Sequence, residues 1–432
     1  MNVTLSGNRY PNEDTIYRTQ LPNGIRLLFF ENPSSPSVSF AGVSGSGTLY
    51  DPAHLPGLGG FLAGAMMRGT EARDFNEIYQ ILEGSGATLG FSPSVHQTTF
   101  RGRMLAEDYE LLLTLLYEGL TAPTFPEPHL IQVRDQILSG LARQAQDPET
   151  MASVIFDKAL FGDHPYGIDS RGTEETIRSI TRADLLNQHH RFFNPQNTIL
   201  CVSGGISPEQ ATEAFTRIFA DWRTDESQGL HLHANAIPVS DPIPSVNHHE
   251  IAEKSQLALM IGSIAPARKS ADYMPVRLGN AILGEFGMMG RIGKTVREDN
   301  GMAYYAGSSV LFLPWGGAWE ISAGINPANL TKVVALIREE VKRFTAEKAS
   351  ETELADVKAN LIGSLPLMLE SNAGIASQLL SMELYQLGLD YLQNYETLVN
   401  SVTEEIILET VKKYLNPEKL VITSSGTLSG EA

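Results

Sequence analysis

The hydrophobic pattern of the chain alternates between two periods. Short runs rich in apolar and β-branched residues, such as residues 25–32 (IRLLFFEN), 98–105 (TTFRGRML) and 257–265 (LALMIGSIA), predict strands. Longer stretches with apolar residues three and four apart, such as residues 107–120 (EDYELLLTLLYEGL) and 330–347 (LTKVVALIREEVKRFTAE), predict amphipathic helices. The mixture predicts an α+β protein whose lobes are mostly antiparallel sheets, each with helices packed on one face.

An internal repeat relates the two halves of the chain. Residues 179–204 and 401–426 align without a gap at one offset of 222 residues. Each copy predicts a helix capped by Thr181 or Thr403, then an Asn-Pro pair that ends the helix, and then a short strand that ends in Ser-Gly. Because chance rarely keeps one register through a cap, a breaker and a strand, the repeat predicts two homologous lobes.

A proline-rich segment separates the lobes. Residues 229–250 (GLHLHANAIPVSDPIPSVNHHE) contain three prolines within seven positions, which is typical of an exposed linker. We therefore expect an N-terminal lobe over residues 1–228, a linker over residues 229–246 and a C-terminal lobe over residues 247–432.

Composition narrows the class of protein. With 42% apolar and 19% charged residues, the 432-residue chain has the material for globular lobes. The net charge of −18 argues against nucleic acid as a partner. No apolar run approaches the roughly 20 residues of a membrane helix, and the N-terminus has no secretory pattern. We expect a soluble cytoplasmic protein, or a periplasmic one if a leader has been removed, with the single cysteine, Cys201, as a buried structural thiol.

Three N-terminal segments carry a family resemblance. Residues 21–32 (LPNGIRLLFFEN), 45–70 (GSGTLYDPAHLPGLGGFLAGAMMRGT) and 118–140 (EGLTAPTFPEPHLIQVRDQILSG) resemble the pitrilysin, insulinase and mitochondrial processing peptidase family, the inverzincin zinc peptidases. In that family a helix carries His-x-x-Glu-His, in which two histidines bind zinc and the glutamate activates water. A further glutamate downstream completes the zinc shell.

The residues for this metal chemistry are missing here. Alignment on Gly57 and on Arg68-Gly69-Thr70 places Gly60, Ala63 and Gly64 at the His, Glu and His positions of the family. If Arg134 matches the family's basic residue, Gly140 stands at the position of the downstream glutamate. The resemblance thus implies a degenerate site without a zinc ligand or a general base, and no metal or other cofactor in this chain.

Histidines elsewhere offer little for a metal. Adjacent histidines on a helix point about 100° apart, and others fall in or beside the linker, so we do not expect a second metal site. His164 matches a loop common in the family and is expected to be structural. The histidines in close pairs are His189 and His190, His231 and His233, and His248 and His249.

The C-terminal half keeps a different part of the family's site. Residues 278–310 (LGNAILGEFGMMGRIGKTVREDNGMAYYAGSSV) resemble the family segment in which an arginine precedes a Gly-x-Ala-Tyr turn. The matching residues are Arg297 and Tyr304, which in the family hold the substrate backbone and help stabilise the oxyanion. The alternative interpretation makes Arg297 one end of a surface ion pair with Glu298 and Tyr304 an ordinary strand aromatic.

Two other sequence features bear on substrate binding. Gly284, Gly287 and Gly290 form a loose glycine-rich stretch, either a flexible loop near the substrate path that contacts substrate or a plain turn. Gly90 and Phe91 stand where the family has an Asn-Ala pair, which agrees with loss of catalysis in the N-terminal lobe.

In the family, some members are heterodimers of one zinc-bearing chain and one chain with the Arg/Tyr pair. The resemblance therefore implies a non-catalytic subunit, inactive alone, of a heterodimeric zinc metallopeptidase. It would enclose a peptide-binding chamber with a zinc-bearing homologous subunit and supply Arg297 and Tyr304 for substrate binding and transition-state stabilisation. Two alternatives stay open: a structural scaffold subunit, and a stand-alone peptide-binding homodimer without proteolysis.

Overall fold

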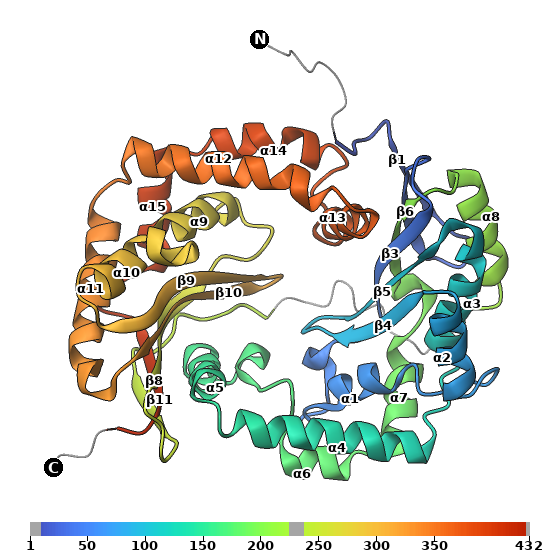
Figure 1. Cartoon of the computed structure of the whole chain (residues 1–432), viewed down its shortest axis with the longest axis horizontal. Coiled ribbons are helices and arrows are strands. Elements are labelled where there is room, and N and C mark those ends of the chain that lie inside the picture. Colours follow the sequence, from blue (N-terminus) through green and yellow to red (C-terminus); the bar gives the residue numbers. More distant parts are fainter. Residues whose placement is uncertain (1–9, 224–236, 429–432) are drawn as a thin grey trace. The chain divides into compact units, whose positions relative to one another are not determined.

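The computed structural model describes residues 10–223 and 237–428, which form two compact units (Figure 1). Among the described residues, unit 1 draws on residues 10–141, 169–223 and 365–395. Unit 2 draws on residues 142–168, 237–364 and 396–428. Each unit therefore contains chain from both halves of the sequence.

Unit 1 is built on a six-stranded sheet in the order β1-β2-β6-β3-β5-β4, in which every neighbouring pair is antiparallel except β2 and β6. One face of this sheet and the helices against it enclose a single apolar core, to which Phe29, Phe100 and Phe215 contribute. The strands are β1 (Ile16–Gln20), β2 (Arg26–Glu31), β3 (Ser37–Ser44), β4 (Thr88–Pro93), β5 (Thr98–Leu105) and β6 (Ile199–Gly204). The helices that share this core are α1 (Leu58–Ala65), α2 (Phe75–Gly84), α3 (Tyr109–Thr121), α4 (Glu127–Gln144), α6 (Glu174–Ser179), α7 (Arg182–Phe192) and α8 (Pro208–Ile218).

Unit 2 repeats this plan with a five-stranded sheet in the order β7-β11-β8-β10-β9, where only β7 and β11 are parallel. On one face, buried Trp319 donates from its indole Nε1 to the side-chain oxygen of Asn280 on α9, at 3.0 Å. The strands are β7 (Val246–Glu250), β8 (Leu257–Ala265), β9 (Ala303–Leu313), β10 (Gly316–Ile325) and β11 (Val421–Gly426). The main helices are α5 (Pro148–Phe161), α9 (Tyr273–Asn280), α11 (Leu330–Ala346), α12 (Glu351–Met368) and α15 (Glu404–Tyr414). The predicted fold class, an α+β protein with two mostly antiparallel sheets, is confirmed, but the helices are not confined to one face of each sheet.

The opposite face of each sheet carries a helix that the other half of the sequence supplies. Helix α5 packs on β8 and β11 of unit 2, where the Thr423 hydroxyl donates to the carbonyl oxygen of Ala152 at 3.0 Å. Helix α13 (Asn372–Tyr385) packs on β3 and β6 of unit 1. There Glu383 accepts hydrogen bonds from both Arg18 and Arg26, at 2.9–3.1 Å. This exchange of helices was not part of the sequence prediction.

The internal repeat is confirmed element by element. Helices α7 and α15 begin and end 222 residues apart, and so do strands β6 and β11. The side chains of Thr181 and Thr403 each cap their helix by accepting a backbone N–H. Local capping and strand propensity are thus retained in both copies although most side chains differ.

Of the predicted linker, residues 229–236 lie outside the described residues, and residues 237–245 form neither helix nor strand. Within the described part of the chain, no helix combines the length and the apolarity that crossing a bilayer requires.

Candidate functional site

The degenerate metal positions lie on the two expected helices of unit 1. Gly60, Ala63 and Gly64 occupy α1 at spacings that put them on one face, and Gly140 lies on α4. Gly64 is exposed and Gly60 and Gly140 are half-buried, whereas Ala63 is buried. Neither glycine nor alanine has a side-chain atom that can bind a metal or accept a proton, so these residues do not fit a zinc ion.

Space does not explain the three glycines. A Cβ atom at Gly140 would meet no atom within 4 Å, and at Gly60 the nearest would be the carbonyl oxygen of Ser170 at 3.9 Å. At Gly64 it would meet Cγ1 of Val133 at 3.4 Å, an ordinary van der Waals contact. The fold of this chain therefore leaves room for larger side chains at all three positions.

The start of α1 is held by a half-buried carboxyl group. Asp51 accepts hydrogen bonds from the backbone N–H groups of Gly57 and Gly59 at 2.9 and 2.8 Å. Burial raises the pKa of the Asp51 carboxyl to about 7, although those backbone donors act in the opposite direction. The scaffold that would present a His-x-x-Glu-His motif is thus intact, while the functional side chains are absent.

The described histidines serve packing and hydrogen bonding. His189 lies buried on α7, where its Nε2 atom is 3.0 Å from the carbonyl oxygen of Leu120, and burial lowers its pKa to about 4. His164 accepts the backbone N–H of Tyr166 and lies 3.0 Å from the carbonyl oxygen of Ile237, consistent with the predicted structural role.

His248 lies on β7 between Ser424 and Glu250, at 2.9 and 3.0 Å. His231 and His233 lie outside the described residues. Among the residues that are described, no group of three or more His, Cys, Asp or Glu side chains could hold a metal ion. Cys201 is buried on β6, and burial raises the pKa of its thiol well above the usual value.

Arg297 and Tyr304 lie close in sequence in unit 2. Arg297 belongs to a π-helical turn over Lys294–Glu298, and Tyr304 is the second residue of β9. Both side chains are exposed, that of Tyr304 to 58%. Neither makes an ion pair or a side-chain hydrogen bond with another described residue, so the alternative ion pair between Arg297 and Glu298 is not formed. Two polar groups remain available to a ligand.

The glycine-rich segment before Arg297 packs closely. A Cβ atom at Gly284 would approach the backbone nitrogen of Ser308 to 2.6 Å, and one at Gly290 would approach the Cα atom of Gly284 to 2.5 Å. Gly287 has φ +57° and open space around it. Close backbone approach thus explains glycine at two positions and a left-handed turn at the third. Contact of the three glycines with substrate stays a prediction.

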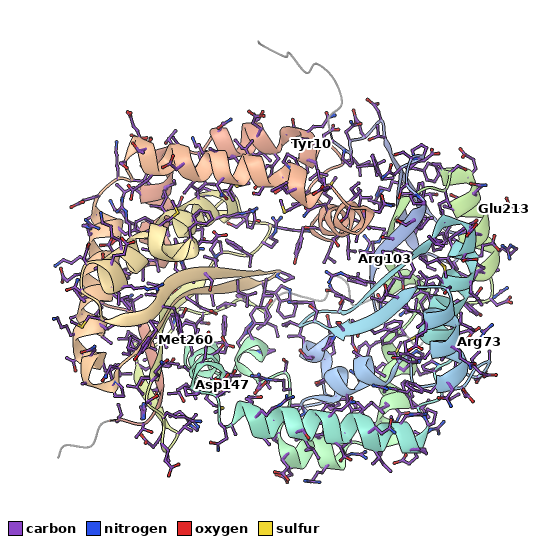
Figure 2. The ribbon with its side chains drawn as sticks, viewed as in Figure 1. Tyr10, Arg73, Arg103, Asp147, Glu213 and Met260 are labelled. Carbon is purple, nitrogen blue, oxygen red and sulfur yellow. The ribbon has the colours of Figure 1, made fainter. Side chains whose placement is uncertain are left out.

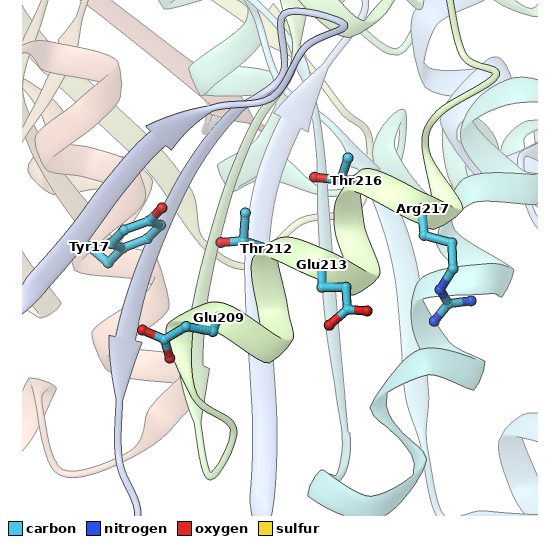
Figure 3. Close-up of a pocket in the computed structure, with 6 residues that line it drawn as sticks. All are labelled: Tyr17, Glu209, Thr212, Glu213, Thr216 and Arg217. Carbon is cyan, nitrogen blue, oxygen red and sulfur yellow. The ribbon is translucent and has the colours of Figure 1, made fainter.

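The structure also contains pockets that no sequence motif indicated. A groove of 560 Å³ in unit 1 lies between β1 and α8 (Figure 3). Its carboxylates, Glu209 and Glu213, lie one helical turn apart, while Arg217 is paired with Glu110 at 2.7 Å. The remaining lining residues are Tyr17, Thr212 and Thr216. A smaller pocket of 240 Å³ in unit 2 is lined by residues of α9 and β9 that include Arg277, Asn280 and Ser309.

Comparison with known proteins identifies the family that this fold and its degenerate helix indicate. Residues 26–174 match the insulinase family (peptidase family M16), and residues 179–361 match the peptidase M16 inactive domain. An uncharacterized zinc protease of Mycobacterium leprae is 24% identical over 369 residues, which cover 85% of this chain and 82% of the relative. The uncharacterized zinc protease YmxG of Bacillus subtilis is 24% identical over 360 residues, covering 82% and 85%.

Solved structures extend the similarity to nearly the whole chain. A peptidase M16 inactive domain protein from Pseudomonas fluorescens superposes with a TM-score of 0.89 at 27% identity, covering 96% of this chain and 99% of that one. A protease from Helicobacter pylori shares the fold with a TM-score of 0.86 at 17% identity, covering 96% of this chain and all of that one. The two adjoining domain matches, the shared fold and the position of the degenerate helix show that the chain belongs to the insulinase family of peptidases, family M16.

Proposed function

We propose that this protein is the non-catalytic subunit of a heterodimeric zinc metallopeptidase. It pairs with a zinc-bearing homologous subunit, and the two enclose a chamber for peptide substrates. The observation that carries the proposal is an asymmetry between the two halves: the metal positions hold only glycine and alanine, whereas Arg297 and Tyr304 are exposed and unpaired among the described residues.

The chemistry of the two retained side chains supports this role. A guanidinium group offers several fixed donors to a peptide carbonyl or a terminal carboxylate. A phenol hydroxyl can donate to an oxygen on which negative charge develops. Neither side chain is committed to an ion pair or a side-chain hydrogen bond with another described residue, so both are available to a ligand. Metal chemistry is assigned to the other subunit, because this chain has no ligand at the corresponding positions.

The test is peptidase activity on an unstructured peptide with zinc present. The chain alone, a zinc-motif homologue alone and their verified complex are compared. Activity only in the complex supports the proposal, and Arg297→Ala or Tyr304→Phe should then lower kcat/KM by about 100-fold, the scale for removing one transition-state donor. Arg223→Ala and Tyr79→Phe, at exposed positions of unit 1, serve as matched controls and should leave kcat/KM unchanged.

Two results would redirect the assignment. Activity of this chain alone would refute the degenerate site outright. If a verified complex is formed and its activity does not respond to Arg297→Ala and Tyr304→Phe, the scaffold role becomes the remaining assignment for this chain.

A further inference from the structure

The open face of the unit 1 sheet carries two neighbouring arginines. On this face α13 packs on β3 and β6, whereas the helices that contact β5 and the edge strand β4, namely α1, α2 and α3, belong to the apolar core on the other face. Along β5, Phe100, Gly102 and Met104 are buried toward the core, so the alternate residues point to the other face. Arg101 and Arg103 lie on that face, both exposed; Figure 2 labels Arg103.

Among the described residues, these arginines have no counter-ion. The sequence has 50 acidic and 32 basic residues, so acidic partners are in excess. On the same sheet, Arg18 and Arg26 share the carboxylate of Glu383. Arg101 and Arg103 make neither an ion pair nor a side-chain hydrogen bond with any described residue. A local positive patch therefore persists on an acidic protein.

The neighbouring strand β4 has an opening beside Arg101, which we call the passage. In the antiparallel register, Gly90 of β4 lies opposite Arg101 and Thr88 opposite Arg103. A Cβ atom at Gly90 would meet nothing within 4 Å, so no side chain stands between Arg101 and the free edge of β4. From the sequence, this glycine indicated only that the asparagine of the family is missing.

We propose that Arg101 and Arg103 bind the acidic side chains of an extended peptide lying along the free edge of β4. The inference rests on the proposed function and specifies its substrate class: peptides with an acidic residue, or two acidic residues separated by one position. The binding is a charge-assisted hydrogen bond between guanidinium and carboxylate, with no covalent step.

Strand geometry supports this occupant. Neighbouring strands lie about 4.8 Å apart, so a peptide added to β4 would lie about 10 Å from β5, a distance that an arginine and a glutamate side chain can span together over a glycine. Side chains two residues apart on a strand are separated by about 6.7 Å in the peptide and in β5 alike, which matches two acidic residues to two arginines. The net charge of −18 disfavours a polyanion such as nucleic acid and tolerates a peptide with one or two carboxylates.

The experiment measures peptide binding to the full chain by fluorescence anisotropy. Two labelled peptides differ only at the centre, with Glu-Thr-Glu in one and Gln-Thr-Gln in the other. The Glu peptide should bind about 10-fold tighter, from two partly exposed charge pairs. The double variant Arg101→Gln/Arg103→Gln should abolish the difference. Arg223→Gln makes a matched change of charge at an exposed site outside the strands and should preserve the difference.

A second variant tests the geometry without changing charge. Gly90→Val places a branched side chain in the passage on a strand that accepts valine, and should lower the affinity for the Glu peptide several-fold while the Gln peptide changes little. The double arginine variant and Gly90→Val are both checked for native circular dichroism. Loss of the preference in the first and its weakening in the second support the inference.

Four results would overturn it. Equal affinities for the two peptides, a preference that survives Arg101→Gln/Arg103→Gln, or no binding of either peptide each refute the acidic-peptide site. A preference unaffected by Gly90→Val refutes the edge-strand geometry on which the inference depends. The heterodimer proposal is decided separately, by activity of the mixed complex and its response to Arg297→Ala, so failure of one is distinguishable from failure of the other.

Discussion

Replacing the three glycines of the degenerate site by alanine should stabilise unit 1. A helical glycine costs about 0.5–1 kcal/mol relative to alanine. Gly140 lies well inside the 18-residue helix α4, so its replacement should contribute about 1 kcal/mol. Gly60 and Gly64 lie near the ends of the eight-residue helix α1, where about half of that value each is expected. The triple variant should therefore gain about 2 kcal/mol in free energy of unfolding.

Packing around the three glycines gives no reason to expect a smaller gain in stability. An added methyl group would meet open space at Gly140 and only ordinary contacts at Gly60 and Gly64. At about 2–4 °C per kcal/mol, the transition temperature of unit 1 should rise by about 5 °C in calorimetry. Gly102→Ala is the contrasting control, because its Cβ atom would lie 2.4 Å from the ring of Phe40 and should destabilise the same unit.

A triple variant no more stable than the wild-type chain would refute this reasoning. It would mean that glycine at these helix positions is required by a contact within the isolated protein. A variant that is more stable alone yet fails to assemble with a zinc-bearing subunit would place the requirement for glycine in the complex.

Three further predictions concern individual buried groups. Glu383→Gln should destabilise the protein by about 2 kcal/mol in urea unfolding, because Arg18 and Arg26 lose their shared carboxylate, with the half-exposed Arg18 limiting the loss. Burial acts to raise the pKa of Glu383, but the two arginines outweigh it, so the pKa is lowered in the fold. The stability that this carboxylate contributes is therefore present above pH 4.5 and lost in acid. Glu383→Gln should flatten that acid dependence of the free energy of unfolding. His189 is buried with its pKa lowered from 6.5 to about 4, so stability should fall by up to about 3 kcal/mol between pH 6.5 and 4, and His189→Gln should remove this pH-dependent loss. Asp51→Ala should cost about 1–2 kcal/mol of thermal stability through loss of the α1 cap, and an unchanged transition temperature would contradict the capping role.

Local chemistry made much of the fold predictable. The cap residues Thr181 and Thr403, and the Asn-Pro breaks that follow, act within a few residues of chain, so the sequence alone predicted two copies of the same helix and strand. The degenerate metal site was predictable for a similar reason. A missing side chain at Gly60 or Gly64 cannot be replaced by folding, since no backbone arrangement gives glycine a metal ligand.

Other features depended on contacts between residues far apart in sequence. Periodicity along the chain does not identify which sheet a helix covers, and α5 and α13 each pack on the sheet opposite to the one that its half of the sequence suggests. The partner of Glu383 likewise lies more than 350 residues away.

The sequence by itself determined the family resemblance, the two homologous lobes and the glycine and alanine residues at the family's metal positions, because these follow from residue identity and local propensity. Only the tertiary structure decided that Arg297 and Tyr304 are exposed without an ion pair to another described residue. It likewise decided that Arg101 and Arg103 lack a counter-ion in the described ranges and that the space at Gly90 is open. The physical reason is that exposure and pairing are properties of three-dimensional neighbours. A charged residue has the same identity in the sequence whether its partner is a carboxylate of the fold or a ligand from solution.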